Sequence, residues 1–409
     1  MKKNKFDLNK ISPIKYFCAL SAVGIVLFFI YAFFAGTDAL NWFFIENNGI
    51  WELSDHFRQV GFARDLSRVY FDNNYNACFP PLAYLYYHFI YKMNPVEADS
   101  DTWLFNGATI SYEPILLIMQ TIIITVAFLY FAHKMLSVKL EKSIITILLV
   151  LLSMPFFSGV LERGNILFLV VVLLMAAVYL KDSEASWKRE IAMVFIAIAS
   201  AFKITPAIFG LIYIKEKRYK EAFRLVVYGV IFFFLPFVFT GGVEGFKAFL
   251  EALSLQSGGS IPERWTCISG FIYHFLYMKI FGAKTITKIV QIGFLLSMVI
   301  AMFITDKKWR EYYYLSNVLA FFVISNYRYT MTYLIIPCFL LLADMEANDK
   351  KKNYTNWGVI TGFALVFTIP VWWFFGDIEH WTCSVCYLMC VITLIFEIIQ
   401  FIMKRKNKD

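Results

Sequence analysis

Long apolar stretches alternate with short polar or basic segments along most of the chain, and this pattern predicts membrane-spanning helices. The stretches lie near residues 16–36, 114–132, 144–159, 166–180, 191–214, 225–240, 285–304, 312–325, 329–343, 357–375 and 381–396. A helix needs about 20 residues to cross the hydrocarbon core, and most of these stretches approach that length. We therefore expect an all-α polytopic membrane protein, with two longer loops at residues 36–112 and 241–284.

The apolar stretch from Ile191 to Ile214 is unusual because it contains one ionised side chain, Lys203. An unpaired ammonium near the bilayer centre costs about 2.5 to 3.5 kcal/mol, so such a lysine usually marks function or a membrane edge. Pro206 lacks an amide donor and biases Thr205 away from helical geometry. We predict that the helix breaks at Lys203 and that the lysine faces a wet cavity that accepts an anion. The alternative is one continuous helix whose lysine reaches the interface or pairs with a neighbour.

Composition supports the membrane class and excludes a water-soluble globular fold. Hydrophobic residues make up 59% of the 409 residues and charged residues only 17%, and the mean hydropathy is +0.61. The net charge of +8 comes from short basic clusters at the ends of the apolar stretches. Such clusters are typical of membrane topology and not of a nucleic-acid surface. We expect residues 1–409 to form a single membrane domain.

The distribution of lysine and arginine predicts the orientation, because the cytoplasmic segments of membrane proteins are enriched in both. If the stretch around Lys203 forms two short helices that both return to the cytoplasm, most of the 38 basic residues lie in cytoplasmic segments. Both chain termini are then cytoplasmic, and segments 36–112 and 241–284 are external. Helices this short rise only about 17 Å, so they must be covered by neighbours or line a cavity.

The first external segment carries candidate chemistry for the outer surface. Residues 52–70 have apolar positions at helical spacing among charged neighbours, which predicts a helix that lies along the interface and carries Asp55. A short aromatic helix from Leu82 to Tyr91 is expected after Phe79-Pro80-Pro81. The second external segment is expected to hold a surface-lying apolar helix after the loop Ser257-Gly258-Gly259-Ser260.

Three arginines lie at or near polar breaks that this orientation places outside. Arg163 belongs to the string Glu162-Arg163-Gly164-Asn165, Arg264 follows the loop of the second external segment, and Arg328 lies between two apolar stretches. A guanidinium presents a forked donor that suits phosphate, and glycine permits close approach of the backbone. The alternative for Arg163 and Arg328 is an anchor at the level of the lipid headgroups.

The seven cysteines indicate little chemistry. Cys78 and Cys267 share the predicted external side and can pair in an oxidising compartment, and two free thiols are the alternative. Cys383 and Cys386 have the spacing of a zinc or redox pair, but no second pair or suitable histidine follows them. We expect no metal site and no cofactor.

The order of these features resembles the GT-C superfamily of membrane glycosyltransferases, which take sugars from polyprenyl-phosphate donors. It is most similar to glycosyltransferase family 87, the bacterial polyprenol-phosphate-mannose-dependent mannosyltransferases, and to the catalytic subunit of GPI mannosyltransferase I. The resemblance spans residues 10–345. It rests on Asp55, Phe79-Pro80-Pro81-Leu82, Arg163-Gly164-Asn165, Phe202-Lys203-Ile204-Thr205-Pro206 and the break and span from Ser325 to Pro337.

The resemblance implies a GT-C fold of about 11 to 13 transmembrane helices, some of them short and broken, with amphipathic helices on the outer face. The implied activity is inverting transfer of a sugar, a hexose such as mannose, from a polyprenyl-phosphate donor to a lipid-linked or cell-envelope glycan acceptor. The implied partners are the donor, the acceptor and the membrane. The implied location is the cell membrane, with the active site on its extracytoplasmic side.

The resemblance also assigns roles to individual residues. Asp55 corresponds to the aspartate that activates the acceptor, since a carboxylate can take the proton of an attacking hydroxyl. The leaving phosphate needs charge stabilisation more than a proton. Candidate ligands of the donor phosphate or sugar are Arg163, Asn165, Lys203, Arg264 and Arg328.

Departures from the family pattern and alternative classes of function stay open. Many relatives carry a paired acidic motif in the first loop, whereas Ser54 and His56 flank Asp55. The acid pair of Asp99-Ser100-Asp101 lies in the wrong place and is expected in a solvated loop, and Asp65 is a rival base. The other class is a lipid or glycan transporter or flippase, in which Lys203 holds a phosphate in transit. A polysaccharide polymerase or ligase is a further alternative.

Overall fold

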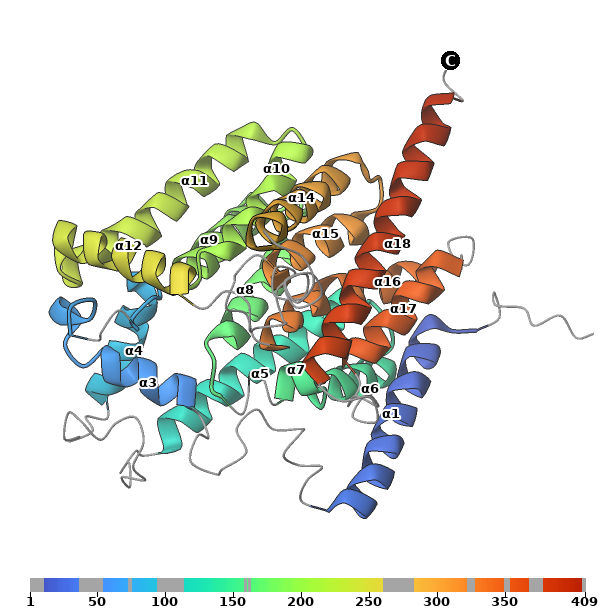
Figure 1. Ribbon diagram of the computed structural model, residues 1–409, viewed down its shortest axis with the longest axis horizontal. Helices are drawn as coiled ribbons and strands as arrows, with labels where there is room; N and C mark the ends of the chain where they lie inside the picture. Colours follow the sequence, from blue (N-terminus) through green and yellow to red (C-terminus); the bar gives the residue numbers. More distant parts are fainter. Residues whose placement is uncertain are drawn as a thin grey trace, which may run out of the picture. The chain divides into compact units, whose positions relative to one another are not determined.

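The described residues form helices and turns and contain no strand (Figure 1), which confirms the all-α class. The computed structural model describes residues 11–36, 54–72, 76–93, 114–157, 160, 163–259, 283–321, 328–348, 354–367 and 378–406.

Helices of membrane-spanning length and composition confirm a polytopic membrane protein. Within the described residues, five helical segments are long and apolar enough to cross a bilayer. They are Pro13–Ala35, Met119–Leu136, Tyr219–Phe239, Tyr329–Ala347 and Val385–Met403. Three shorter apolar segments accompany them, namely Leu167–Leu180, Thr205–Lys215 and Ile289–Ile304. The total of 11 to 13 crossings and the sidedness stay predictions.

Contacts between residues divide the chain into two compact units, each assembled from separate parts of the sequence. Unit 1 comprises residues 1–45, 132–158 and 264–409, and unit 2 comprises residues 46–131 and 159–263. The sequence-based expectation of a single membrane domain stays a prediction.

Unit 1 is organised around one helix that is buried on every side. Its helices are α1 (Pro13–Ala35), α6 (Leu140–Leu151), α7 (Met154–Phe156), α14 (Ala283–Ile304), α15 (Lys308–Phe321), η6 (Arg328–Leu334), α16 (Ile335–Ala347), α17 (Tyr354–Phe367) and α18 (Ile378–Lys406). From Trp309 to Phe321 nearly every residue of α15 is buried, and α15 packs against α14, α16 and η6. Arg310 of α15 forms a buried ion pair with Glu397 of α18, with 2.8 Å between Nη1 and Oε2.

Unit 2 is organised around α9. Its helices are α3 (Ser54–Phe62), η2 (Leu66–Arg68), α4 (Pro81–Met93), most of α5 (Pro114–Leu136), α8 (Leu167–Leu180), α9 (Ser186–Phe202), η4 (Thr205–Gly210), α10 (Leu211–Lys215), α11 (Tyr219–Phe234), η5 (Leu235–Phe239) and α12 (Gly242–Gly259). α9 packs against α8 and α11 and also contacts α4, while α3 packs on α4. α9 thereby holds together segments that are distant in the sequence.

The predicted helix break at Lys203 is confirmed. α9 ends at Phe202, and Lys203 has extended backbone angles, with φ of −144° and ψ of 123°. The chain then continues as the 3₁₀ turn η4, with Pro206 near its start, and as the short helix α10. Proline has no amide hydrogen and is favoured at the first turn of a helix, so it begins the new element where the old one ends. The continuous-helix alternative is wrong.

Two of the expected external helices have different bounds in the structure. The helix expected over 52–70 ends at Phe62, because Asp65 adopts an extended conformation and its carboxylate accepts hydrogen bonds from the amide and hydroxyl of Ser67. The aromatic helix is confirmed as α4. Ser257, Gly258 and Gly259 were expected in a loop but form the last turn of α12, and the rest of the second external segment, 260–282, lies outside the described residues.

Candidate active site

Asp55 lies in the first turn of α3, where the partial positive charge of the helix N-terminus favours a carboxylate. Its side chain is partly exposed, at 17%. The backbone amide of the next residue, His56, donates to the carbonyl of Arg163 over 3.2 Å. The start of α3 is therefore joined directly to the turn that leads into α8.

That turn positions Arg163 and Asn165. Gly164 has φ of +62°, a left-handed conformation that glycine adopts without steric cost. The backbone amide of Asn165 donates to the backbone carbonyl of Val160 over 3.0 Å. Its side-chain Oδ1 accepts from the backbone amide of Leu167 over 2.9 Å, which satisfies a donor at the start of α8. Asn165 is thus fixed against the first residue of α8.

Asp55 accepts three hydrogen bonds from these two residues, although 108 and 110 positions separate it from them. Arg163 Nε donates to Oδ2 over 2.9 Å and Arg163 Nη2 donates to Oδ1 over 2.6 Å, which is the two-point fork of an arginine–carboxylate pair. Asn165 Nδ2 donates to Oδ2 over 2.6 Å. The carboxylate is held on both of its oxygens.

The pKa of Asp55 lies below its usual value. Burial alone would raise this pKa, but the hydrogen bonds and charge of Arg163, the hydrogen bond of Asn165 and the charge of Lys203 outweigh that effect. Asp55 is therefore a carboxylate at neutral pH in the structure as it stands.

Lys203 adds a second cation to this site. Its Nζ lies 5.5 Å from the centroid of the Phe79 ring, within the range of a cation–π contact. Phe79 is itself held in place, because the Tyr70 hydroxyl donates to its carbonyl over 2.8 Å and its amide donates to the Tyr84 hydroxyl over 3.3 Å. The string Phe79-Pro80-Pro81 thus supplies the ring under the lysine.

His56 follows Asp55 but its side chain is buried, with 1% exposed. Its ring packs edge-on to that of Tyr87 with 5.8 Å between centroids. Burial lowers the pKa of His56 to about 4, so its imidazole is neutral at neutral pH.

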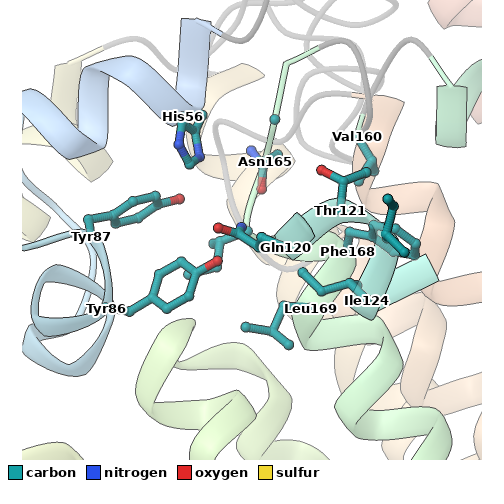
Figure 2. Close-up of a pocket in the computed structure, with 13 residues that line it drawn as sticks. His56, Tyr86, Tyr87, Gln120, Thr121, Ile124, Val160, Asn165, Phe168 and Leu169 are labelled. Atoms are coloured by element: carbon teal, nitrogen blue, oxygen red, sulfur yellow. The ribbon is translucent and has the colours of Figure 1, made fainter. Parts of the chain in front are cut away.

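A cavity of about 340 Å³ lies beside these residues in unit 2. Figure 2 shows the His56 ring and the hydroxyl ends of Tyr86 and Tyr87 directed toward the same space as Gln120 and Asn165. Its remaining lining is Thr121, Ile122, Ile124, Val160, Gly164, Ile166, Phe168 and Leu169. None of the lining residues is Lys, Arg, Asp or Glu, so the cavity is polar but uncharged at one end and apolar elsewhere.

The structure brings together Asp55, Arg163, Asn165 and Lys203 of the predicted site residues. Arg264 lies outside the described residues, as do Cys267 and the acidic string Asp99-Ser100-Asp101. Arg328 begins η6 in unit 1. Asp65, the rival base, is exposed and caps η2.

Sequence reasoning missed the polar lining formed by Tyr86, Tyr87 and Gln120. The only local signal was the density of tyrosine in α4, which is equally typical of a packed interface helix. Among the described residues, no three His, Cys, Asp or Glu side chains cluster closely enough to hold a metal ion.

A family model for glycosyltransferase family 87 matches residues 108–326, more than half of the chain. The chain belongs to glycosyltransferase family 87. The matched segment contains Arg163, Asn165 and Lys203, whereas Asp55 precedes it. Comparisons with curated proteins and with solved structures gave no significant match. Family membership makes the protein a membrane glycosyltransferase, which supports transfer over the transporter alternative.

Proposed function

We propose that this family 87 member is an inverting hexosyltransferase that moves a sugar such as mannose from a polyprenyl-phosphate donor to a lipid-linked or cell-envelope glycan acceptor. The observation that carries the proposal is the placement of the Asp55 carboxylate beside two cations, Arg163 and Lys203. A base next to cations is what sugar transfer from a phosphate leaving group requires.

In the proposed reaction, the acceptor oxygen attacks the anomeric carbon from the face opposite the phosphate. Asp55 takes the proton of the acceptor hydroxyl as the new carbon–oxygen bond forms. The bond between the anomeric carbon and the phosphate oxygen breaks, and its electron pair stays on the phosphate. Anomeric configuration inverts, and the products are the glycosylated acceptor and polyprenyl phosphate.

The leaving phosphate gains one negative charge in this step, so it needs a cation more than a general acid. Arg163 offers a planar fork that matches two phosphate oxygens, and Lys203 offers a compact point charge. Arg163 is hydrogen-bonded to Asp55, the charge of Lys203 acts on Asp55, and the Phe79 ring contacts the ammonium. Arg264 and Arg328 remain further candidate ligands of the donor phosphate.

The sidedness of the reaction is part of the proposal. The excess of lysine and arginine in the predicted cytoplasmic segments supports cytoplasmic termini and an extracytoplasmic Asp55. Cysteines introduced one at a time at positions 57 and 408, in a variant whose seven native cysteines are replaced by serine, and treated with a membrane-impermeant thiol reagent in intact cells test this. Position 57 is expected to react and position 408 to react only after the membrane is opened.

Incubation of the purified protein with a panel of polyprenyl-phosphate sugars tests the activity. Each donor is paired with a lipid extract as acceptor, and the measured product is free polyprenyl phosphate. We expect one hexose donor to be consumed with formation of a glycosylated lipid. Consumption of nucleotide sugars but of no polyprenyl-phosphate sugar would overturn the proposed donor class.

A further inference from the structure

The hydrogen bonds on Asp55 pose a mechanistic problem for its role as a base. Arg163 contacts both carboxylate oxygens, and Oδ2 also accepts from Asn165. A carboxylate in a two-point pair with a guanidinium is stabilised in its charged form and has little tendency to take a proton. The arrangement seen in the structure therefore holds the base but weakens it.

The charges in the proposed reaction change in a way that relieves this problem. Before transfer, Asp55 and the phosphodiester of the donor each carry one negative charge. After transfer, the carboxyl is protonated and neutral, and the phosphomonoester of the product can carry two. One unit of negative charge thus moves from Asp55 to the phosphate, while the positive charge nearest to Asp55 belongs to Arg163.

We propose that Arg163 exchanges its partner from Asp55 to the donor phosphate, so that donor binding releases the base, and that Asn165 is the positioning residue that keeps the released carboxylate in place. This inference rests on the proposed function. It requires the donor to bind before the acceptor hydroxyl can be deprotonated.

Asn165 and Arg163 differ in side-chain length and attachment in a way that fits these different roles. Asn165 has a short side chain whose Oδ1 is tied to the start of α8, so its Nδ2 stays directed at Asp55. Arg163 has a long side chain on the turn formed by Gly164, and several rotatable bonds lie between its backbone and its guanidinium. Rotation of that side chain can redirect the fork without moving α3 or α8.

Lys203 supplies a second positive charge, which favours binding of the donor phosphate near Arg163. Its charge acts on Asp55 and also on Arg163, so the two cations are near enough to repel each other. A phosphate placed between them would replace that repulsion with two attractive interactions. The donor can thereby draw Arg163 away from the carboxylate.

Loss of the fork would make Asp55 a stronger base. Burial favours the neutral form of this carboxyl, and it is the hydrogen bonds and charge of Arg163 that chiefly oppose burial. Among the described residues, the charged or titratable groups that act on Asp55 include Arg163 and Lys203, the Tyr87 phenol and the Cys78 thiol, with the neutral His56 ring adjacent in sequence. With Arg163 on the phosphate, the pKa of Asp55 is expected to rise toward the range that suits a general base.

Carbodiimide labelling of protonated carboxyl groups, read by mass spectrometry of the purified full-length protein, tests the exchange. The probe ligand is polyprenyl phosphate, compared with the neutral polyprenol. We expect Asp55 to resist labelling in the free protein. Polyprenyl phosphate is expected to speed the labelling of Asp55, because the protonated fraction rises about tenfold for each increase of one in its pKa. Polyprenol is expected to change nothing.

Arg68 and Asp72 provide an internal control in the same experiment. They form the same two-point pair, with 2.6 Å from Nε to Oδ2 and 2.7 Å from Nη2 to Oδ1, but both side chains are exposed. Labelling of Asp72 is expected to be independent of polyprenyl phosphate. In Arg163→Gln, Asp55 is expected to label fast without ligand and to show no further increase, whereas Arg68→Gln leaves the labelling of Asp55 unchanged.

Asn165→Asp separates the contact of Asn165 with Asp55 from its contact with the start of α8. In its ionised form, aspartate keeps an oxygen that can accept from Leu167, but it offers Asp55 no donor and places a like charge beside it. We expect kcat to fall by about 10- to 100-fold, the equivalent of the roughly 1.5 to 3 kcal/mol typical of a hydrogen bond to a charged group, with little change in KM for the donor. A rise in donor KM with kcat unchanged would make Asn165 a donor ligand instead.

Different experimental results would contradict the exchange of Arg163 and the proposed function. If polyprenyl phosphate shifts the thermal unfolding of the protein but leaves the labelling of Asp55 unchanged, the exchange is wrong and the donor class stands. If polyprenyl phosphate neither binds nor is released in transfer assays, the proposed function itself is wrong.

Discussion

Arg163 donates hydrogen bonds to both carboxylate oxygens of Asp55, over 2.9 and 2.6 Å, and thereby ties the turn before α8 to the first turn of α3. In the proposed mechanism, this contact joins the residue that accepts the proton to a residue that binds the donor phosphate.

Asp55→Asn is expected to lower kcat by about 10²- to 10⁴-fold, the usual contribution of a general base. Asparagine keeps the shape of the side chain but cannot accept the proton of the acceptor hydroxyl. Release of polyprenyl phosphate from the active donor is the measurement. Asp72→Asn, which removes an equally arginine-paired but exposed carboxylate, serves as the control and is expected to stay active. Normal transfer by Asp55→Asn would reject Asp55 as the base.

Lys203→Met is expected to lower kcat/KM for the donor by about 10- to 100-fold, since a hydrogen bond to a charged group is worth about 1.5 to 3 kcal/mol. Methionine retains much of the packing against Phe79 while removing the charge. Initial rates at varied donor concentration measure the effect. Lys188→Met is the matched control, because Lys188 also lies 5.5 Å from an aromatic ring, that of Trp187, at the start of α9. Equal donor kinetics in the two variants would remove Lys203 from the phosphate site.

Much of the fold around the site could be predicted from local patterns in the sequence. The break at Lys203 followed from a charged residue and Pro206 inside an apolar stretch, and α4 followed from Pro80 and Pro81 before a run of aromatic residues. Both signals act within a few residues, which is the range over which backbone chemistry dictates structure. Polarity alone did not reveal the end of α3, because that end depends on the hydrogen bonds that the Asp65 carboxylate accepts from Ser67.

The contacts of the site itself could not be predicted in the same way. Asp55 and Arg163 were expected on the same side of the membrane but in separate roles, since nothing in a local pattern links residues 108 positions apart. Asn165 was expected to face sugar or phosphate oxygens, and the contacts that the structure shows are with Asp55 and the start of α8. Those contacts depend on how α3, α4 and α8 pack, which a single sequence does not encode in any short motif.

Gly164→Ala is expected to destabilise the protein by about 1 to 2 kcal/mol, because an alanine at φ of +62° places its Cβ too close to the following carbonyl oxygen. The strain falls between Arg163 and Asn165, so activity should fall together with thermal stability. Thermal unfolding in detergent and transfer rates measure the two effects. Gly229→Ala in α11 is the control, because a Cβ there meets nothing within 4 Å. An equally small effect at both positions would show that the turn tolerates a side chain.

Acid is expected to destabilise unit 2 through His56. Burial lowers its pKa in the folded protein to about 4, whereas an unfolded histidine titrates near 6.5. Between these values the unfolded chain binds a proton that the folded chain does not, so stability falls as the pH falls, by up to about 3 kcal/mol. His56→Gln should flatten the dependence of the unfolding temperature on pH between about 4 and 6.5. An unchanged slope in this variant would assign the acid sensitivity to other groups.

The buried pair of Arg310 and Glu397 in unit 1 is expected to be structural. Their side chains are 2% and 5% exposed, and removal of one partner leaves the other charge buried without its counter-ion. Arg310→Met or Glu397→Leu alone should therefore cost about 3 to 5 kcal/mol, while the double variant should recover most of that loss because neither charge remains. Thermal unfolding of the two single variants and the double variant measures this coupling.

The exposed pair of Lys247 and Glu244, at 65% and 70%, provides the reference, since Lys247→Met should cost no more than about 1 kcal/mol. Additive losses in the double variant would mean that Arg310 and Glu397 stabilise unit 1 through other contacts, such as the stacking of Arg310 on Trp309 and Phe396.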